Sequence, residues 1–463
     1  MSHLKLISSG FDIGNVFANS ERGHHEDDHE GDVPPWAYLH HQDAYPPTPE
    51  TPQSDVQSEM DLPQPPVDPD EEPLVAVLGV GYVGSHLVSA FSSRYSVVGF
   101  DVSETQIEKL REQYRDSKTV ELTTDTRDIM RATHFLISVP TLLRPDKSVD
   151  SSYLRSALET VGKVGRPGST VVIESSVAVG MTRQLLGPLA QAKGFYAGMS
   201  PERVDPGRTS PPVMSIPKII SALDDVTPGS LSRIQALYGP VFSSVHPVSS
   251  PEAAEMVKLY ENCQRMVCIA YANEMADACV PHGLDPYEVC AAAATKPFGY
   301  MPYYPGAGVG GHCIPVNPYY LLSNGAFPLL EQATSTMWQR PMAVAERALD
   351  SLAHRGIRET GRSPKTLVVG VAFKVGQSSL SNSPGLEIAK KLVVSQKVEV
   401  TWADTLVQQE AIPQIPRLSD DDWRSGVLKT FDLIIVVLRQ HGMNLDLLSG
   451  LEGTEVDWWC KRA

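Results

Sequence analysis

A glycine-rich turn near residue 80 restricts the fold of this chain more than any other feature. Residues 74–78 read Leu-Val-Ala-Val-Leu, which is typical of a buried parallel strand, and the segment Gly-Val-Gly-Tyr-Val-Gly at 79–84 follows directly. A helix is expected from about Ser85. A strand, a G-x-G-x-x-G turn and a helix in this order favour a dinucleotide-binding unit over a turn with a purely structural role.

Each part of this turn has its own task in such a site. Gly79 permits the tight turn, Gly81 lets the backbone approach a pyrophosphate, and Gly84 lets helix and strand pack closely. The start of the helix, with Tyr82 and Val83, supplies N–H groups and the positive end of a dipole to the phosphates. These five residues are therefore the predicted core of the cofactor site.

An acidic residue directly after the next strand favours one dinucleotide cofactor over the other. Asp101 follows a predicted strand at 95–100 and lies 20 residues after Gly81. A carboxylate there can bind a ribose 2′-hydroxyl and repels a 2′-phosphate, so NAD is favoured over NADP. Thr141 and Glu174, near the ends of predicted strands at 135–139 and 170–174, are assigned to the same site.

The charge of the chain is concentrated in its first 72 residues. The net charge is −16. Residues 1–72 hold 16 acidic and two basic side chains, whereas the other 391 residues hold 39 acidic and 37 basic side chains. The nearly neutral remainder gives no sign of a basic nucleic-acid-binding surface. No apolar run approaches the roughly 18 residues that span a bilayer. We therefore expect a soluble protein that binds neither nucleic acid nor membrane.

The acidic segment 1–72 is also rich in proline and histidine, with ten of the 37 prolines and six of the 13 histidines. We expect this tail to be disordered, because it has too few apolar side chains to offset the ordering entropy. The stretch 24–29 (His-His-Glu-Asp-Asp-His) could hold a divalent metal, but a solvated segment explains it better, and no metal site is predicted. The absence of a CxxC pair and of signal-peptide features favours a cytoplasmic location.

The distribution of strands and helices predicts an α/β protein with three ordered parts after the tail. Strands alternate with helices in the first part, as in a doubly wound Rossmann domain. Long helical patterns follow at 252–282, capped by Ser249 or Ser250, and at 286–294. Strands return at 366–371, 398–402 and 433–438, which predicts a second, Rossmann-like unit. The predicted domains are an NAD-binding domain at 73–250, a central helical domain at 251–360, and a smaller α/β domain at 361–463.

One of the six cysteines lies in a glycine-rich loop. Cys313 belongs to Gly-Gly-His-Cys-Ile-Pro at 310–315, whereas the cysteines at 263–290 are expected to pack as small apolar residues on helices. This position alone fits a nucleophilic thiol and a structural thiol equally well. His312 could act as a base, but adjacent side chains usually point apart, so we assign it no catalytic role.

Five motifs together resemble a known family in order and in spacing. The resemblance is to the UDP-glucose/GDP-mannose dehydrogenases, covers about residues 74–440, and is closest to the branch that acts on UDP-N-acetylhexosamines. The motifs are Gly79–Gly84, Ser200–Arg203, Lys258–Asn262, Thr295–Gly299 and Gly310–Pro315. The resemblance implies a nucleotide-sugar 6-dehydrogenase, in which NAD accepts two hydrides as the C6 alcohol of a UDP-sugar becomes a carboxylate.

The resemblance also implies catalytic roles. Cys313 attacks the intermediate aldehyde to form a thiohemiacetal, which is oxidised to a thioester and hydrolysed. Glu202 is the general base of the hydrolysis, and Thr141 helps to hold the water. Lys258 and Asn262 lie four residues apart on one helix, so both can stabilise the same oxyanion.

Further implied residues contact the substrate. Glu202, Lys258 and Asn262 are three of them. The others lie in the loop before the cysteine and in the C-terminal domain, which the resemblance implies binds UDP. These residues are Tyr303, Tyr304, Gly310, Phe373 and Lys374. The central helix pairs with its copy in such enzymes, so a homodimer or a larger homo-oligomer is expected.

The chain departs from the family pattern at functional positions. Asn317 stands where the family has an aspartate, and loss of a general base costs about 10²–10⁴ in rate. Ser379-Leu380-Ser381 replaces Asp-x-Arg, so an arginine that helps to hold the UDP-sugar is missing, at a cost of about 1.5–3 kcal/mol. Cys268 and Ser221 replace a typical Asn and a typical Gly.

Three functions therefore stay open. The first is a working UDP-sugar 6-dehydrogenase. The second is a catalytically impaired paralogue that binds NAD and UDP-sugar and regulates an active partner, as Asn317 and Ser381 suggest. The third, a two-electron hydroxyacid dehydrogenase, gives Cys313 and the C-terminal unit no purpose.

Overall fold

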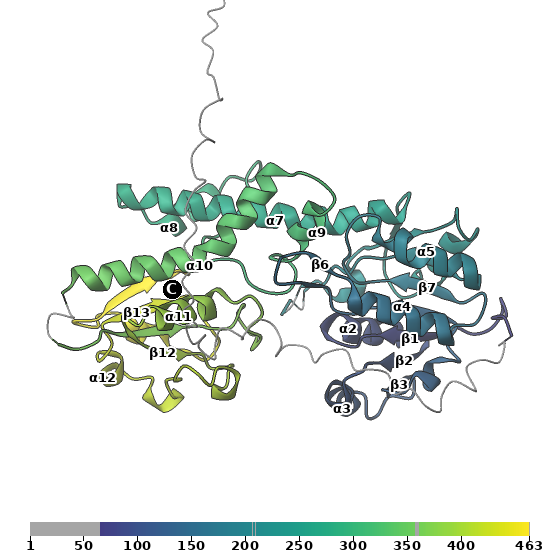
Figure 1. Ribbon diagram of the computed structural model, residues 1–463, viewed down its shortest axis with the longest axis horizontal. Coiled ribbons are helices and arrows are strands. Elements are labelled where there is room, and N and C mark those ends of the chain that lie inside the picture. Colours follow the sequence, from purple (N-terminus) through teal and green to yellow (C-terminus); the bar gives the residue numbers. More distant parts are fainter. Residues whose placement is uncertain (1–64, 206, 209, 357–360, 463) are drawn as a thin grey trace, which may run out of the picture. The chain divides into compact units, whose positions relative to one another are not determined.

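The computed structural model describes residues 65–205, 207–208, 210–356 and 361–462. Most of the predicted tail, with its histidine-rich stretch at 24–29, lies outside these residues. The α/β class is confirmed, with an N-terminal Rossmann unit, a central helical part and a C-terminal α/β unit (Figure 1). Within the described ranges no helix has both the length and the apolar character that crossing a membrane requires.

The N-terminal unit is built on an eight-stranded sheet with the order β10-β9-β8-β7-β4-β1-β2-β3, in which every pairing except β8–β9 is parallel. Its strands are β1 (Leu74–Leu78), β2 (Ser96–Phe100), β3 (Val120–Thr123), β4 (His134–Ile137), β7 (Thr170–Ile173), β8 (Tyr196–Met199), β9 (Lys218–Ala222) and β10 (Val245–Pro247). Its helices are α2 (Tyr82–Phe91), α3 (Glu104–Gln113), α4 (Ser152–Val164), α5 (Met181–Lys193) and α6 (Ser230–Tyr238). A hairpin of β5 (Leu142–Leu143) and β6 (Val149–Asp150) follows β4.

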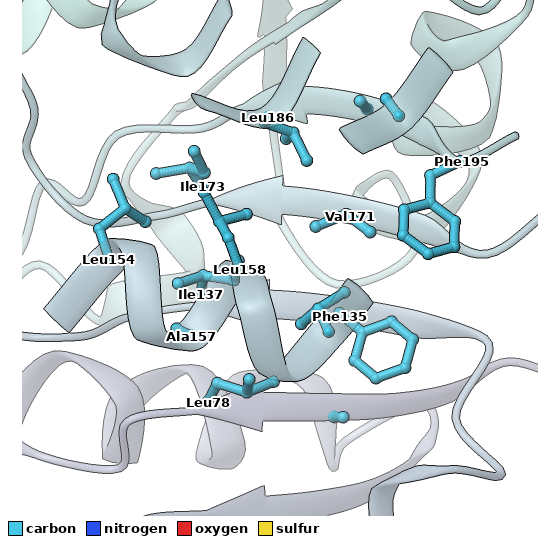
Figure 2. Packing of buried hydrophobic residues seen from close by; sticks show 14 of the residues in the cluster. Leu78, Phe135, Ile137, Leu154, Ala157, Leu158, Val171, Ile173, Leu186 and Phe195 are labelled. Carbon is cyan, nitrogen blue, oxygen red and sulfur yellow. The ribbon is translucent and has the colours of Figure 1, made fainter. Parts of the chain in front are cut away.

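Both faces of this sheet are buried, because its parallel strands are apolar on alternate sides. Val75 and Val77 of β1 pack with α2, α3 and α6, whereas Ala76 and Leu78 pack with α4 and α5. Figure 2 shows the second of these cores, where Leu158 of α4 meets side chains from β1, β4 and β7. The strand order reverses between β1 and β4, and this switch point is where open α/β sheets bind their ligands.

The central part consists of α7 (Pro251–Cys279), α8 (Pro286–Ala293), α9 (Asn317–Leu322) and α10 (Pro328–His354). Helix α7 begins where the sequence predicts, since the Ser250 hydroxyl accepts a hydrogen bond from Ala253 N at 3.3 Å. The apolar sides of α7, α9 and α10 form one core that includes Leu259, Met266 and Met337. This core fixes α9, and therefore the loop that leads into it, against α7.

The C-terminal unit has a parallel sheet with the order β12-β11-β13-β14. Its elements are β11 (Lys365–Val369), α11 (Pro384–Val394), β12 (Glu399–Ala403), α12 (Ser425–Leu428), β13 (Leu433–Val436) and β14 (Glu455–Trp458). It repeats the glycine turn of the first unit: Gly370 follows β11 with φ +81°, and a Cβ at Gly385 would lie 2.4 Å from the Gly370 carbonyl oxygen. Asp404 after β12 accepts hydrogen bonds from Val371 N and Ala372 N at 3.1 Å. The unit is therefore Rossmann-like in its turn as well as in its sheet.

Candidate active site

The turn after β1 has the geometry that a pyrophosphate needs. Gly79 has φ +83°, and a Cβ there would lie 2.6 Å from the Ser138 carbonyl oxygen, so only glycine fits between β1 and β4. A Cβ at Gly84 would lie 1.9 Å from the Gly79 oxygen. At Gly81 no heavy atom lies within 4 Å of the Cβ position, so a phosphate could approach the backbone. The residues present therefore fit a dinucleotide.

Asp101 holds the same turn in place. Its Oδ2 accepts a hydrogen bond from Val80 N at 2.9 Å, and its Oδ1 accepts one from Ser103 N at 3.0 Å. Each carboxylate oxygen has a further lone pair, so a ribose hydroxyl can still bind there. Tyr82, 43% exposed, and Val83 form the first turn of α2 beside this position.

The glycine geometry yields a prediction for the cofactor site. Gly84→Ala is expected to lower stability by about 1–3 kcal/mol, because its Cβ overlaps the Gly79 backbone. The variant should also show no detectable NAD binding in a fluorescence titration. Its Tm should be lower than that of the wild type. Gly426→Ala, where no heavy atom lies within 4 Å of the Cβ position, is the matched control and should change neither quantity. Unchanged NAD affinity in Gly84→Ala would contradict this assignment of the turn.

Glu174 is buried beneath the site rather than exposed in it. Its side chain is 0% exposed, its Oε2 accepts from Lys218 Nζ at 2.5 Å, and its Oε1 accepts from the Tyr238 hydroxyl. Burial raises the pKa of Glu174, and the charge and hydrogen bond of Lys218 oppose that rise. Its backbone oxygen accepts from Glu202 N at 3.3 Å. This arrangement favours support of the 200–203 segment over direct contact with the cofactor.

Three predicted catalytic residues meet between α7 and α9. Lys258, Asn262 and Asn317 are at most 5% exposed. The Asn262 side-chain amide donates to Asn317 Oδ1, and Asn317 N donates to the Cys313 carbonyl oxygen at 2.9 Å. The residue after Thr141 is connected to α9, since the Tyr320 hydroxyl donates to the Leu142 carbonyl oxygen at 3.3 Å. The start of α9 therefore brings the cysteine segment to the polar face of α7.

The segment that contains Glu202 is tied to the same face. Lys258 Nζ donates to the Glu202 carbonyl oxygen, and the Glu202 carboxylate accepts from Val204 N. Arg203 anchors the segment further, since its guanidinium pairs with Glu261 of α7 at 2.6 Å. Glu202 is 7% exposed, so it is shielded from bulk water but remains on the surface of the site.

The cysteine loop is fixed against the C-terminal unit. Gly311 N donates to the Ser381 carbonyl oxygen at 2.8 Å, and Asn382 Nδ2 donates to the Gly311 carbonyl oxygen at 2.9 Å. His312 Nδ1 and Ser381 Oγ share a hydrogen bond of 3.0 Å, so His312 is directed to the C-terminal unit. A Cβ at Gly310 would lie 2.9 Å from Phe373 Cβ, so two predicted substrate residues are in contact.

Lys374, which is predicted to contact the substrate, is engaged with the N-terminal unit. Its Nζ lies 2.7 Å from Asp205 Oδ1, three residues after Glu202. Although burial acts to raise the pKa of Asp205, the Lys374 hydrogen bond and charge hold it below its usual value. Tyr303 is half-buried and Tyr304 is 46% exposed, on the loop that leads to the cysteine.

Sequence reasoning missed two charged residues of this site, Asp205 and Arg265. Arg265 donates through its guanidinium to Asn262 Oδ1. The available signal was helical periodicity, because residues 258, 262 and 265 lie at i, i+4 and i+7 and share one face of α7. Arginine on a helix is usually a solvated residue, so the spacing alone did not single it out.

The chain is similar to known proteins in its domains, its sequence and its structure. The model of the UDP-glucose/GDP-mannose dehydrogenase family, NAD binding domain, matches residues 74–242, and that of the central domain matches residues 252–336. The UDP-N-acetyl-D-glucosamine 6-dehydrogenase of Pseudomonas aeruginosa is 32% identical over 360 residues, which cover 73% of this chain and 83% of that protein. The UDP-N-acetyl-D-mannosamine dehydrogenase of Pyrococcus horikoshii is 33% identical, with 72% and 84% covered. The solved structure of the UDP-D-ManNAc dehydrogenase from Pyrococcus horikoshii superimposes with a TM-score of 0.72 at 27% identity, over 83% of this chain and 99% of that one.

Proposed function

The chain belongs to the UDP-glucose/GDP-mannose dehydrogenase family, with NAD as its cofactor, and from that premise we propose that it oxidises the C6 alcohol of a UDP-sugar to a carboxylate through a thioester on Cys313. The similarity to relatives named for UDP-N-acetyl-D-glucosamine and UDP-N-acetyl-D-mannosamine supports a UDP-N-acetylhexosamine as the substrate. UDP-glucose is the other candidate. The domain limits at 73–250, 251–360 and 361–463 are part of the same proposal.

The cofactor and the protein divide the chemistry. When bound, NAD would supply the hydride acceptor for each of the two oxidations, one molecule per oxidation. The turn at 79–84 and Asp101 bind and orient it. The protein must hold the reacting carbon between the oxidations, and this is the role we assign to the Cys313 thiol.

The side chains of α7 stabilise the charge that forms on the substrate oxygen. Addition of the Cys313 sulfur to the aldehyde forms a C–S bond and places negative charge on that oxygen, which takes a proton to give the thiohemiacetal. The Lys258 ammonium and the Asn262 amide lie on the face that contacts the cysteine segment. Preorganised donors in a site that excludes water are worth a few kcal/mol each.

Hydrolysis of the thioester needs a base and a held water. Glu202 accepts a proton from the attacking water, and the thiol of Cys313 leaves as the carboxylate forms. Thr141, next to the Leu142 carbonyl that Tyr320 of α9 bonds, and Asn317, the first residue of α9, orient the water but take no proton. The single observation that carries the proposal is that α7 holds both segments through buried hydrogen bonds: Lys258 donates to the Glu202 carbonyl oxygen, and Asn262 donates to Asn317, whose N donates to the Cys313 carbonyl oxygen.

The test is a substrate screen with the purified full-length chain. UDP-N-acetylglucosamine, UDP-N-acetylmannosamine and UDP-glucose are supplied with NAD, and NADH and the uronate product are counted. Two NADH per uronate are expected with one of the first two sugars. One NADH per sugar with free aldehyde would refute the thioester route.

The same screen separates the second candidate function. Asn317 and Ser381, which replace an acid and an arginine of the family pattern, favour an impaired paralogue that regulates an active partner. Tight binding of both NAD and UDP with no NADH from any of the three sugars, together with co-purification of an active homologue, would favour that reading instead.

We further propose that α7 pairs with its copy in a homodimer. Exposed apolar side chains lie on one stripe of this helix, because Met256, Tyr260, Tyr271 and Met275 fall within about 100° of its circumference. Tyr260 and Tyr271 are 70% and 62% exposed, and a contiguous patch of this kind is typical of a protein interface.

The dimer is tested by placing a charge on the stripe. Tyr271→Glu is expected to shift the chain from dimer to monomer in light scattering, because an unpaired carboxylate is costly in an apolar interface. Leu406→Glu, at a 37% exposed apolar residue of the C-terminal unit, is the control. A variant of Tyr271 that stays dimeric at the lowest measurable concentration would place the interface elsewhere.

A further inference from the structure

The β5–β6 hairpin joins the segment after β4 to the central helices. It begins directly after Thr141. Its apolar side chains Leu143 and Val149 pack against the core shared by α7, α9 and α10. At its base, the Tyr320 hydroxyl of α9 donates to the Leu142 carbonyl oxygen at 3.3 Å. The hairpin is therefore attached to the same helix that follows the cysteine loop.

The tip of this hairpin has a residue in an unfavourable backbone conformation. Arg144 N donates to the Ser148 carbonyl oxygen at 2.9 Å, and Lys147 N donates to the Arg144 carbonyl oxygen at 2.8 Å. Lys147 has φ +66°, which is the left-handed region. Short hairpin loops usually place glycine in that conformation, because a Cβ is costly there. The backbone gains nothing from a lysine at this position, so any benefit comes from its side chain.

The Lys147 side chain lies on two aromatic rings of the central helices. Its Nζ is 3.3 Å from the centroid of the Trp338 ring on α10 and 5.9 Å from that of Tyr319 on α9. Lys147 is half-buried, although residues 144–146 before it are exposed. Burial lowers the pKa of Lys147, and the charge of Glu387 opposes that fall. A cation over a tryptophan face is the best of the cation–π pairs and gains strength when it loses water.

Trp338 is better explained as a platform for this cation than as a space-filling residue. Its Nε1 is buried and has no hydrogen-bond partner within the part of the chain that the structure describes. An unsatisfied buried donor is costly, so a phenylalanine would fill the same space at less cost. Tryptophan exceeds phenylalanine in its affinity for a cation on the ring face. Lys147 and Trp338 therefore each compensate for an unfavourable feature of the other.

We propose that Lys147 is a positioning residue of the dehydrogenase site, which holds the hairpin on α9 and α10 through Trp338 and so fixes Thr141 relative to Asn317. Asn317 is the first residue of α9. The proposed function gives Thr141 and Asn317 the water that cleaves the thioester. The inference therefore rests on that function for the reaction, but not for the Lys147–Trp338 contact. A displacement of about 1 Å in such a group can cost 10²-fold in rate.

Lys147→Gly in the full-length chain tests the role most sharply, because it relieves the turn and removes the contact at once. A lysine with a purely structural role predicts a higher Tm and an unchanged kcat. A positioning role predicts a kcat about 3- to 30-fold lower, the range of a cation–π contact. The affinity for NAD should not change, because the turn at 79–84 is untouched. Gln396→Gly, at φ +53° after α11, is the matched control and should leave kcat unchanged.

A set of variants at both partners separates the contact from a general effect of the substitution. Lys147→Arg should keep most of kcat, because a guanidinium also binds an aromatic face, whereas Lys147→Met keeps only the stem and should lose it. Trp338→Leu should lower kcat as Lys147→Met does, and the double variant should fall no further, since each change removes the same contact. Lys163→Met, at an exposed lysine of α4, controls for the loss of charge.

Two results would overturn the proposal. One is a wild-type kcat in both Lys147→Gly and Lys147→Met. The other is a double variant of Lys147 and Trp338 whose losses in kcat multiply, because independent effects would then explain both residues. Weaker NAD binding in parallel with the fall in kcat would count against it equally, since the N-terminal unit as a whole would be disturbed.

Failure of this inference is distinguishable from failure of the proposed function. If the Lys147 variants oxidise UDP-sugar as fast as the wild type, the positioning role falls and the dehydrogenase activity stands. If the wild type forms no NADH with any sugar, the proposed function falls, and the contact is measured by fluorescence instead. The emission of Trp338, obtained as the difference between the wild type and Trp338→Phe, should change in Lys147→Met. An unchanged difference spectrum would show that the contact does not form.

Discussion

Replacing Cys313 with serine is expected to stop uronate formation while some of the first oxidation continues. Removal of the covalent nucleophile should lower the overall rate by about 10³-fold or more, because a serine hydroxyl is a far weaker nucleophile toward the aldehyde and no thioester can form. The stoichiometry should fall from two NADH per sugar to at most one, with aldehyde released. Quantifying NADH and aldehyde in the same reaction measures both consequences.

Cys460→Ser is the matched control for this variant. Cys460 follows β14 in the C-terminal unit, and burial raises the pKa of its thiol to about 11, so little thiolate forms there at neutral pH. Serine at that position should leave both the rate and the stoichiometry unchanged. If Cys313→Ser still released two NADH for each uronate, the covalent route would have to be abandoned, although the cofactor site would be unaffected.

The elements that the sequence predicts well are those with a strong local signal. The apolar run at 170–174 becomes β7, and the predicted helix at 252–282 becomes α7, with Ser250 as its cap. Weak local signals were missed: β8 reads Tyr-Ala-Gly-Met and β10 has three residues, so neither gives an apolar run. Helix α2 begins at Tyr82, three residues before the predicted start, because Gly84 belongs to the helix as well as to the turn.

The site could be predicted only in part, because its contacts join distant segments. The common face of Lys258 and Asn262 follows from a spacing of four on one helix. Asn262 and Asn317 are in contact although they lie 55 residues apart in the sequence, and no periodic pattern predicts such a contact. Arg265 was missed for a different reason, since an arginine on a helix is usually solvated and its hydrogen bond to Asn262 Oδ1 is seen only in three dimensions.

Replacing Asn317 with aspartate is expected to increase activity, which a substitution at a purely structural residue would not do. Asn317 is 1% exposed and accepts a hydrogen bond from the Asn262 amide through Oδ1. An aspartate has the same shape and keeps that acceptor, and Lys258 and Arg265 on the facing helix would offset its charge. Because an aspartate can also take a proton from the attacking water, Asn317→Asp is expected to raise kcat about 10²-fold, with KM little changed.

The gain should appear in hydrolysis and not in hydride transfer. Single-turnover measurements separate the two, since NADH forms during oxidation and the uronate forms only when water cleaves the thioester. Asn444→Asp is the control, because Asn444 caps a short helix through Oδ1 at the surface and an aspartate there keeps the cap. If Asn317→Asp left the hydrolysis rate unchanged, position 317 would not face the attacking water, and Glu202 alone would have to supply the base.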